Sequence, residues 1–226
     1  MILTADGSPS LRLPAAGITY HSIHGAIRES MHVFIGAGLR HLLSKNKWEE
    51  IRILEMGLGT GLNALLTGLE AEENKQPVLY EALEAFPLSQ EEALPLNYPT
   101  LLGRADWQER FMALHAGVFN QPFSWTPEIT FTNWKTTLQE FTSSQRFHLV
   151  YYDAFAPAAQ PELWTADIFQ KLNACMEPGG LLVTYCSKGD VQRALKAAGF
   201  IIEKIPGPPG KREMLRATVA DKHLGA

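Results

Sequence analysis

Short runs rich in apolar residues alternate along the chain with segments whose apolar residues recur every three or four positions. Such a run between turn signals is typical of a buried strand, and the longer spacing is typical of a helix with one buried face. The runs that predict strands lie at residues 51–54, 78–83, 129–132, 147–152 and 181–186, and the predicted helices lie at residues 62–69, 160–176 and 190–198. This alternation predicts an α/β protein with a mostly parallel sheet and helices on both faces.

The two ends of the chain depart from this alternation. Residues 11–20 predict a short hairpin with its turn at residues 14–17, and residues 24–43 carry apolar side chains at helical spacing. Residues 200–205 and 212–219 predict two strands joined by a stiff loop rich in Pro and Gly. After a parallel sheet, such a pair is typical of an antiparallel hairpin at the sheet edge.

We therefore expect one core domain with two additions. Residues 1–46 are predicted to form an N-terminal extension, a hairpin plus a helix, that packs on a core of residues 47–226. An aromatic-rich insertion near residues 87–127 predicts extra helices, which either wall a substrate site or pack on the sheet in the ordinary way. The 226 residues, with 46% hydrophobic content, suffice for one buried core.

Composition narrows the class of protein. No apolar run approaches the roughly 18 residues that cross a bilayer, and the first residues lack the pattern of a secretory signal. The seven histidines have no HExxH or CxxC company, so we predict no metal site. Cys175 and Cys186 lie in apolar surroundings and are interpreted as reduced packing residues. Together these features predict a cytoplasmic protein without a membrane segment.

Charge is unevenly distributed along the chain. The formal net charge of −4 argues against non-specific coating of nucleic acid by the whole surface. Between residues 186 and 216, however, seven Lys and Arg residues outnumber three acids. This basic segment is either one surface for a polyanion or a solvated helix beside a charged loop. For a nucleic acid, Lys211 and Arg212 are the first candidates for phosphate contacts.

The strongest chemical signal is the turn after the first core strand, Glu55-Met56-Gly57-Leu58-Gly59-Thr60-Gly61-Leu62-Asn63. Glycines there let the backbone approach a ligand and leave N–H groups of a helix start free. The spacing is GxGxG, and Leu62 stands where the dinucleotide fingerprint requires a third glycine. Because Glu55 suits an ammonium or sulfonium better than a pyrophosphate, we interpret the turn as a site for S-adenosylmethionine. The alternative is a turn whose glycines and acid only shape the strand end.

Polar residues also follow the next two strands. Glu84, after the second core strand, is placed to accept hydrogen bonds from both ribose hydroxyls, which a nicotinamide cofactor would also require. Strand alternation points Glu81 to the opposite face. Asn133 and Trp134, after the third strand, are candidates for the edge and face of adenine, although both residue types also make turns and core.

The fourth strand leads into Asp153-Ala154-Phe155-Ala156-Pro157. Ligands of open α/β sheets bind beyond the carboxyl ends of the strands, so we expect Asp153 to face the cofactor. A carboxylate at this position orients or deprotonates an amine nucleophile, while Phe155 and Pro157 shape a pocket for a flat substrate. A helix cap or a purely structural aspartate is the alternative.

Several separated motifs resemble the methyltransferase domain of the bacterial tRNA 5-methylaminomethyl-2-thiouridine biosynthesis (MnmC) family, a group of class I S-adenosylmethionine-dependent methyltransferases. The motifs are the glycine turn, Ser22-Ile23-His24-Gly25-Ala26-Ile27-Arg28-Glu29-Ser30 with His32-Val33-Phe34, Glu84-Ala85-Phe86-Pro87-Leu88, the Asp153–Pro157 loop, Pro161-Glu162-Leu163-Trp164-Thr165, Pro178-Gly179-Gly180 and Gly210-Lys211-Arg212-Glu213-Met214-Leu215. They span nearly the whole chain. The resemblance implies a Rossmann-like fold with a mostly parallel, seven-stranded sheet.

The resemblance also implies roles for the matched positions. The cofactor S-adenosylmethionine would be held by Glu55, Gly57, Gly59, Gly61, Asn63 and Glu84, the reacting site would be lined by Asp153, Phe155 and Pro157, and Glu29 and Ser30 are assigned to the substrate pocket. The implied reaction is methylation of the exocyclic amine of 5-aminomethyl(-2-thio)uridine at the wobble position of tRNA. Asn133 departs from the acid that many methyltransferases carry there, and we expect no flavin-binding half in this chain.

Three other functions stay open at this point. The first is S-adenosylmethionine-dependent methylation of another small-molecule or protein amine. The second is a nicotinamide-dependent dehydrogenase, which the GxGxG spacing disfavours. The third is a nucleoside- or RNA-binding module without turnover, which the joint presence of Glu55, Glu84 and Asp153 disfavours.

Overall fold

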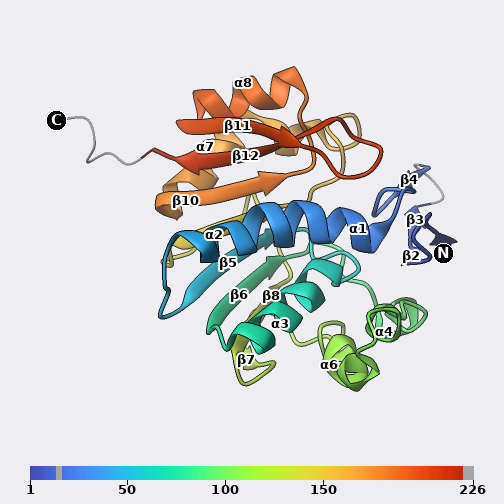
Figure 1. The fold of residues 1–226 in the computed structure, drawn as a ribbon. Helices are drawn as coiled ribbons and strands as arrows, with labels where there is room; N and C mark the ends of the chain where they lie inside the picture. Colours follow the sequence, from blue (N-terminus) through green and yellow to red (C-terminus); the bar gives the residue numbers. More distant parts are fainter. Residues whose placement is uncertain (14–16, 221–226) are drawn as a thin grey trace.

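A single open sheet forms the centre of the molecule, with helices on both of its faces (Figure 1). The computed structural model describes residues 1–13 and 17–220. In spatial order the strands are β11 (Phe200–Pro206), β12 (Glu213–Val219), β10 (Met176–Thr184), β9 (Phe147–Tyr152), β5 (Ile51–Met56), β6 (Val78–Leu83), β8 (Ile129–Trp134) and β7 (Phe123–Ser124).

The strand directions follow the prediction of a mostly parallel sheet. The strands β10, β9, β5, β6 and β8 are parallel neighbours, while β12 runs antiparallel between β10 and β11. The sheet has eight strands rather than the expected seven. The additional strand is β7, a two-residue segment that pairs antiparallel with the edge strand β8. The carboxyl ends of β5, β6 and β9 therefore lie side by side at one edge, where the predicted chemistry is concentrated.

Alternation along the strands divides the core into two layers. In β9, whose six residues are all buried, Leu149 and Tyr151 pack on one face and Val150 and Tyr152 on the other. The first face is covered by α3 (Leu62–Asn74) and by a continuous helical rod made of α1 (Ala26–Ser30), the π-helical η1 (Met31–Arg40) and α2 (His41–Lys45). The second is covered by η3 (Pro161–Trp164), α7 (Ala166–Ala174) and α8 (Gly189–Ala197).

The N-terminal segment adds two small hairpins beside the carboxyl ends of the strands (Figure 1). In the first, β1 (Ile2–Leu3) pairs with β2 (Pro9–Ser10). In the second, β3 (Arg12–Leu13) pairs with β4 (Ile18–Thr19). The predicted turn of this second hairpin falls largely on residues 14–16, which lie outside the described residues.

The insertion near residues 87–127 contains four short helical segments: α4 (Gln90–Ala93), α5 (Tyr98–Leu101), η2 (Ala105–Trp107) and α6 (Gln108–Ala113). Its large aromatic side chains belong to the core. Trp107 and Phe111 are fully buried, and the Trp107 ring packs edge-on against Trp125 with 5.7 Å between the ring centroids. Ordinary packing on the sheet is thus the role that the structure gives these aromatic residues.

The predicted helix at residues 160–176 was wrong in its bounds. It is divided at Thr165, whose Oγ1 accepts a hydrogen bond from the Ile168 N–H and caps α7. It also ends early, because β10 already begins at Met176. The register of β10 against β9 shifts between Met176 and Leu181, where Pro178-Gly179-Gly180 interrupts the ladder.

Three further predictions concern cysteines, metals and membranes. Cys175 and Cys186 are both unpaired, as predicted, with Cys186 buried and Cys175 partly buried. Within residues 1–13 and 17–220, no group of three His, Cys, Asp or Glu side chains is arranged to hold a metal ion. No helix in the same ranges is long and apolar enough to cross a membrane.

Candidate active site

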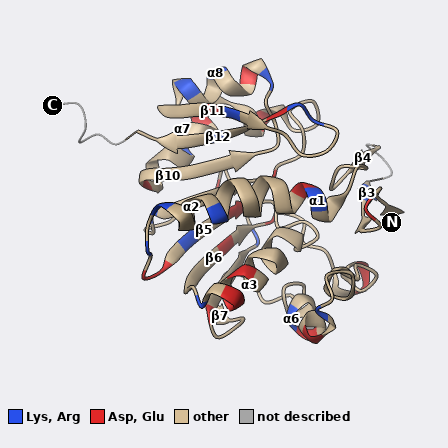
Figure 2. Cartoon of the chain, in the orientation of Figure 1, with Lys and Arg blue, Asp and Glu red and all other residues tan. Residues whose placement is uncertain are grey.

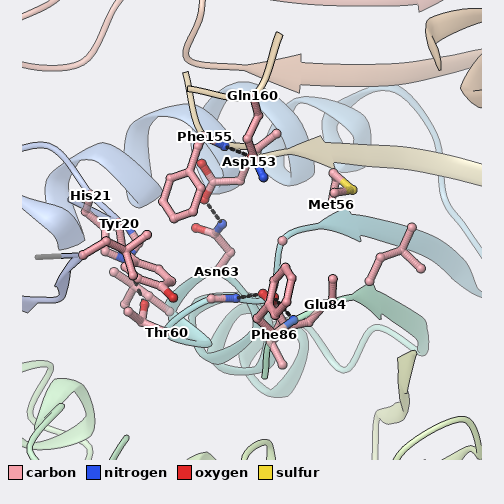
Figure 3. A pocket seen from close by; sticks show the side chains of 18 residues that line it. Tyr20, His21, Met56, Thr60, Asn63, Glu84, Phe86, Asp153, Phe155 and Gln160 are labelled. Atoms are coloured by element: carbon pink, nitrogen blue, oxygen red, sulfur yellow. Dashed lines mark hydrogen bonds between the residues drawn. The ribbon is translucent and has the colours of Figure 1, made fainter. Parts of the chain in front are cut away.

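A cavity opens at the carboxyl ends of β5, β6 and β9 (Figure 3). It encloses about 900 Å³ of empty space, part of which is open to solvent. Its wall combines the turn after β5, the segment after β6 and the loop after β9 with residues of the N-terminal segment, and its lining residues are Leu13, Tyr20, His21, Met56, Gly57, Leu58, Gly59, Thr60, Leu62, Asn63, Leu83, Glu84, Ala85, Phe86, Asp153, Ala154, Phe155 and Gln160. None of these described lining residues comes from the insertion near residues 87–127.

The glycine turn forms the floor of the cavity. Gly57, Gly59 and Gly61 have φ angles of 86°, 51° and 75°, a region that side chains with a Cβ atom rarely adopt. A Cβ atom on Gly59 would also lie 3.0 Å from Cδ1 of Tyr20. The turn therefore requires glycine both for its backbone path and for the space between β5 and the N-terminal segment.

Glu84 is fixed beside this turn by two backbone donors. The Gly59 N–H donates to Oε2 and the Phe86 N–H donates to Oε1, both at 2.9 Å (Figure 3). Each oxygen retains a further lone pair, so the carboxylate is pre-oriented to accept from hydroxyls of a ligand. The Phe86 ring beside it is 84% exposed, which places a bare aromatic side chain among the lining residues.

Asn63 links two carboxylates at the start of α3. Its Nδ2 group donates to Oε1 of Glu55 and to Oδ2 of Asp153, each at 2.9 Å. The second oxygen of Glu55 accepts from the Tyr80 hydroxyl at 2.8 Å. Glu55 is fully buried and does not line the cavity. It therefore acts through Asn63, by holding the amide so that both of its hydrogens point to carboxylates.

Asp153 is the carboxylate that reaches the cavity. Burial and the nearby negative charge of Glu29 raise its pKa well above the usual aspartate range, against the opposing effects of Asn63 and Lys211. The Asp153 N–H donates to the Met56 carbonyl at 3.1 Å, which ties the loop after β9 to the end of β5. A carboxylate with a raised pKa is a stronger proton acceptor, so Asp153 is suited to general-base chemistry.

Glu29 and Lys211, separated by 182 positions in the sequence, form an ion pair behind this loop. Lys211 Nζ lies 2.7 Å from Glu29 Oε1, and the Ser22 N–H donates to Glu29 Oε2 at 2.8 Å. Lys211 Nζ also lies 3.8 Å from the ring centroid of Tyr185, whose hydroxyl donates to the Ala154 carbonyl at 2.8 Å. The pair thus connects the N-terminal helix and the β11–β12 loop to the residue next to Asp153.

Several residues predicted for the site lie elsewhere. Trp134 points to the opposite face of the sheet, where its Nε1–H donates to Glu81 at 2.7 Å. Asn133 is buried and has only a long, 3.5 Å contact from Nδ2 to the Leu114 carbonyl. Ser30 is fully buried, and its Oγ has no partner among the described residues. The structure therefore does not bring these three predicted residues to the cavity.

Pro157 and Arg212 are also absent from the cavity lining. They line a second cleft together with Tyr185 and Lys188, on the other side of the loop that carries Asp153. Lys211 lines the same cleft, but its ammonium group is already bound by Glu29. The prediction that Lys211 and Arg212 act as an equivalent pair does not fit these contacts.

Four cavity residues were not found from the sequence: Tyr20, His21, Thr60 and Gln160. The Tyr20 and Phe155 rings pack edge-on with 5.3 Å between their centroids. His21 Nε2 lies 2.7 Å from Thr60 Oγ1, and burial lowers the His21 pKa to about 4, so the imidazole is neutral near pH 7. Thr60 lies inside the glycine motif and was available as a candidate, whereas the N-terminal hairpin offered no signal.

The family of S-adenosyl-L-methionine-dependent methyltransferases matches the chain over residues 105–220, which include Asp153 and the C-terminal hairpin. This match covers more than half of the chain. The chain belongs to this family. It is therefore an enzyme whose cofactor is S-adenosylmethionine, as the glycine turn predicted, and the nicotinamide-dependent alternative is set aside.

Relatives of this methyltransferase are similar over nearly its whole length. The tRNA 5-methylaminomethyl-2-thiouridine biosynthesis bifunctional protein MnmC of Aromatoleum aromaticum is 31% identical over 239 residues, which cover 100% of this chain and 36% of that protein. MnmC of Burkholderia multivorans is 31% identical over 89% of this chain and 32% of its own length. The chain thus spans about a third of the length of these relatives.

Solved structures agree with the fold. The crystal structure of MnmC2 from Aquifex aeolicus has a TM-score of 0.71 and 26% sequence identity, and the match covers 97% of this chain and 69% of that one. The CMeT domain of the citrinin polyketide synthase, at 15% identity and a TM-score of 0.50, shares the fold alone. The predicted Rossmann-like methyltransferase fold is confirmed.

Replacing Lys211 of the methyltransferase by Met is expected to lower the free energy of unfolding by about 1–3 kcal/mol, because it leaves the Glu29 carboxylate buried without its cation. Urea denaturation measures this loss. The matched control is Lys204→Met, which removes a more exposed ion pair with Glu213 at 3.3 Å and is expected to cost less than about 1 kcal/mol. Equal losses in the two variants would show that the Glu29 pair has no special structural role.

Proposed function

We propose that this methyltransferase transfers a methyl group to the exocyclic amine of 5-aminomethyl(-2-thio)uridine at the wobble position of tRNA. The observation that carries the proposal is Asp153, a carboxylate with a raised pKa at the cavity wall. An amine nucleophile needs such a proton acceptor, because an ammonium group has no lone pair with which to attack. The tRNA substrate is supported by the similarity of the whole chain to the MnmC proteins.

The cavity residues fit S-adenosylmethionine. Glu84 would accept from the ribose hydroxyls, and the turn at Gly57, Gly59 and Gly61 would let the ligand approach the backbone. Asn63 Oδ1 is buried without a partner among the described residues, and a donor such as the ammonium group of the cofactor would satisfy it. When bound, S-adenosylmethionine supplies an electrophilic methyl group on a sulfonium centre.

The protein residues then have two tasks in the reaction. The first is alignment of the amine with the methyl group, a positioning effect that is worth about 7–11 kcal/mol in well-oriented systems. The Asn63 bridge serves this task because it fixes Asp153. The second is removal of a proton from the amine, for which Asp153 is the acceptor at the cavity. Phe155 packs against Tyr20 above this carboxylate and offers an aromatic wall to a flat base.

Methyl transfer to tRNA that carries 5-aminomethyluridine tests the proposal. The purified chain is incubated with labelled S-adenosylmethionine and this tRNA, and the nucleosides are analysed by mass spectrometry. We expect conversion of the aminomethyl to the methylaminomethyl nucleoside, and no label in tRNA that lacks the aminomethyl group. Intact cofactor binding without conversion would reject the tRNA substrate and direct the search to other small-molecule or protein amines.

A further inference from the structure

A second cleft lies behind the loop that carries Asp153. It encloses about 830 Å³ of empty space, including open solvent, and its apolar wall is made by Ala156, Pro157, Tyr185 and Cys186. The loop therefore presents Asp153 and Phe155 to the cofactor cavity, and Ala156 and Pro157 to this second cleft. A ligand held in the cleft would be separated from the reacting carboxylate by a single loop.

The rim of the cleft carries positive charge that the protein itself does not balance. Lys211 is neutralised by Glu29, and Glu213 is neutralised by Lys204 at 3.3 Å. Lys188 and Arg212 are exposed, and neither forms an ion pair with a carboxylate of the described residues. Figure 2 shows the cationic segment of the β11–β12 loop on the same side of the sheet as the start of α8.

The β11–β12 loop is held in place against the N-terminal helical rod. His32 Nε2 lies 2.8 Å from the Pro206 carbonyl, and Lys211 is bound by Glu29. Gly210, with a φ angle of 86°, packs so closely on His24 that a Cβ atom would overlap its ring. Because the loop is fixed on both sides of Arg212, this residue is presented at the cleft by a supported backbone rather than by a free loop.

We propose that this cleft, named here the cationic cleft (Ala156, Pro157, Tyr185, Lys188 and Arg212), binds the RNA nucleotide next to the one that is methylated. The inference rests on the proposed function, and it deepens it by naming the surface that holds the tRNA. Single-stranded RNA is bound by apolar or aromatic surfaces for its bases and by cations for its phosphates. The cationic cleft offers both, on the far side of the loop that receives the target amine.

The proposal assigns different roles to neighbouring cations. Lys188 and Arg212 contact phosphate, whereas Lys211 holds the wall of the cleft through Glu29 and the Tyr185 ring. Removal of the two phosphate contacts should therefore weaken tRNA binding in a salt-dependent way. Each lost contact to a single strand lowers the slope of log affinity against log salt by about 0.7, so the double variant should lose about 1.4.

The test compares Lys188→Gln/Arg212→Gln with the unmodified enzyme on tRNA that carries 5-aminomethyluridine. We expect the KM for tRNA at low salt to rise on the order of tenfold. Between 50 and 200 mM salt, the unmodified enzyme should lose about sevenfold more tRNA affinity than the variant, which corresponds to the slope difference of about 1.4. Affinity for S-adenosylmethionine, measured by calorimetry, reports whether the cofactor cavity is intact.

The matched control is Lys47→Gln/Lys196→Gln. Both lysines are exposed, and they lie before β5 and near the end of α8, at the sheet edge opposite the cationic cleft. This variant has the same net charge as the test variant and is expected to keep the KM and the salt slope of the unmodified enzyme. Equal KM values and slopes in the two double variants would overturn the cationic cleft. Absence of methyl transfer by the unmodified enzyme would instead reject the proposed function and, with it, RNA as the occupant of the cleft.

Discussion

Asp153→Asn is expected to lower the turnover number by about 100-fold or more while the affinity for S-adenosylmethionine stays within a few-fold. The substituted amide oxygen still accepts from Asn63, so the Glu55–Asn63 arrangement is retained. What the substitution removes is a group able to take a proton from the amine. Single-turnover methylation at saturating substrate separates this loss from slow product release.

The pH dependence of the two enzymes provides an independent readout of the same residue. Burial and Glu29 raise the Asp153 pKa, so the acceptor form is present above that raised value and is lost as the pH falls through it. Turnover of the unmodified enzyme should therefore fall on the acid side at a pH above the ordinary aspartate value of about 3.9. Asp153→Asn should lack this acid limb and keep only the dependence that deprotonation of the substrate amine imposes.

Asp167→Asn is the matched control for this substitution. Asp167 is exposed in the first turn of α7 and does not line the cavity. Its replacement changes the net charge by the same amount and is expected to leave turnover and the acid limb unchanged. Asp153→Asn with turnover close to that of this control would show that Asp153 does not accept the proton, and the base would have to be sought among water molecules near Asn63.

The part of the site that could be predicted from the sequence lies at the carboxyl ends of consecutive parallel strands. Glu84, Asn63 and Asp153 each follow a short apolar run directly, or one turn later, so strand order alone brings them to one edge of the sheet. Their joint position was confirmed because this inference needs only local signals and the parallel arrangement. It requires no knowledge of contacts between distant segments.

The remaining contacts depend on long-range packing that no local pattern encodes. The ion pair between Glu29 and Lys211 joins segments 182 positions apart, and it removes Lys211 from the set of free cations. Tyr20 and His21 reach the cavity because the N-terminal segment folds back over the glycine turn. A sequence shows which residues are charged or aromatic, but their partners follow from the assembled fold.

The adenine contacts show how a local pattern leads to the wrong face of a strand. Side chains alternate along β8, and Trp134 lies on the side of Glu81 rather than on the side of the cavity. The neighbouring Asn133 turns toward the insertion, where Leu114 lies. Among the described aromatic side chains that line the cavity, Phe86 follows Glu84 directly and is 84% exposed. The segment after β6 therefore offers both a carboxylate and an aromatic ring to a nucleoside.

Glu84→Gln is expected to raise the dissociation constant for S-adenosylmethionine by on the order of 10- to 100-fold, the equivalent of losing one charge-assisted hydrogen bond. An amide has one accepting oxygen, whereas Glu84 accepts from both the Gly59 and the Phe86 N–H groups. The turn and the ribose contact are therefore weakened together. Calorimetry measures the affinity, and turnover at saturating cofactor should change much less than in Asp153→Asn. The control, Glu91→Gln in the exposed part of α4, should bind normally. Unchanged affinity in Glu84→Gln would place the ribose elsewhere in the cavity.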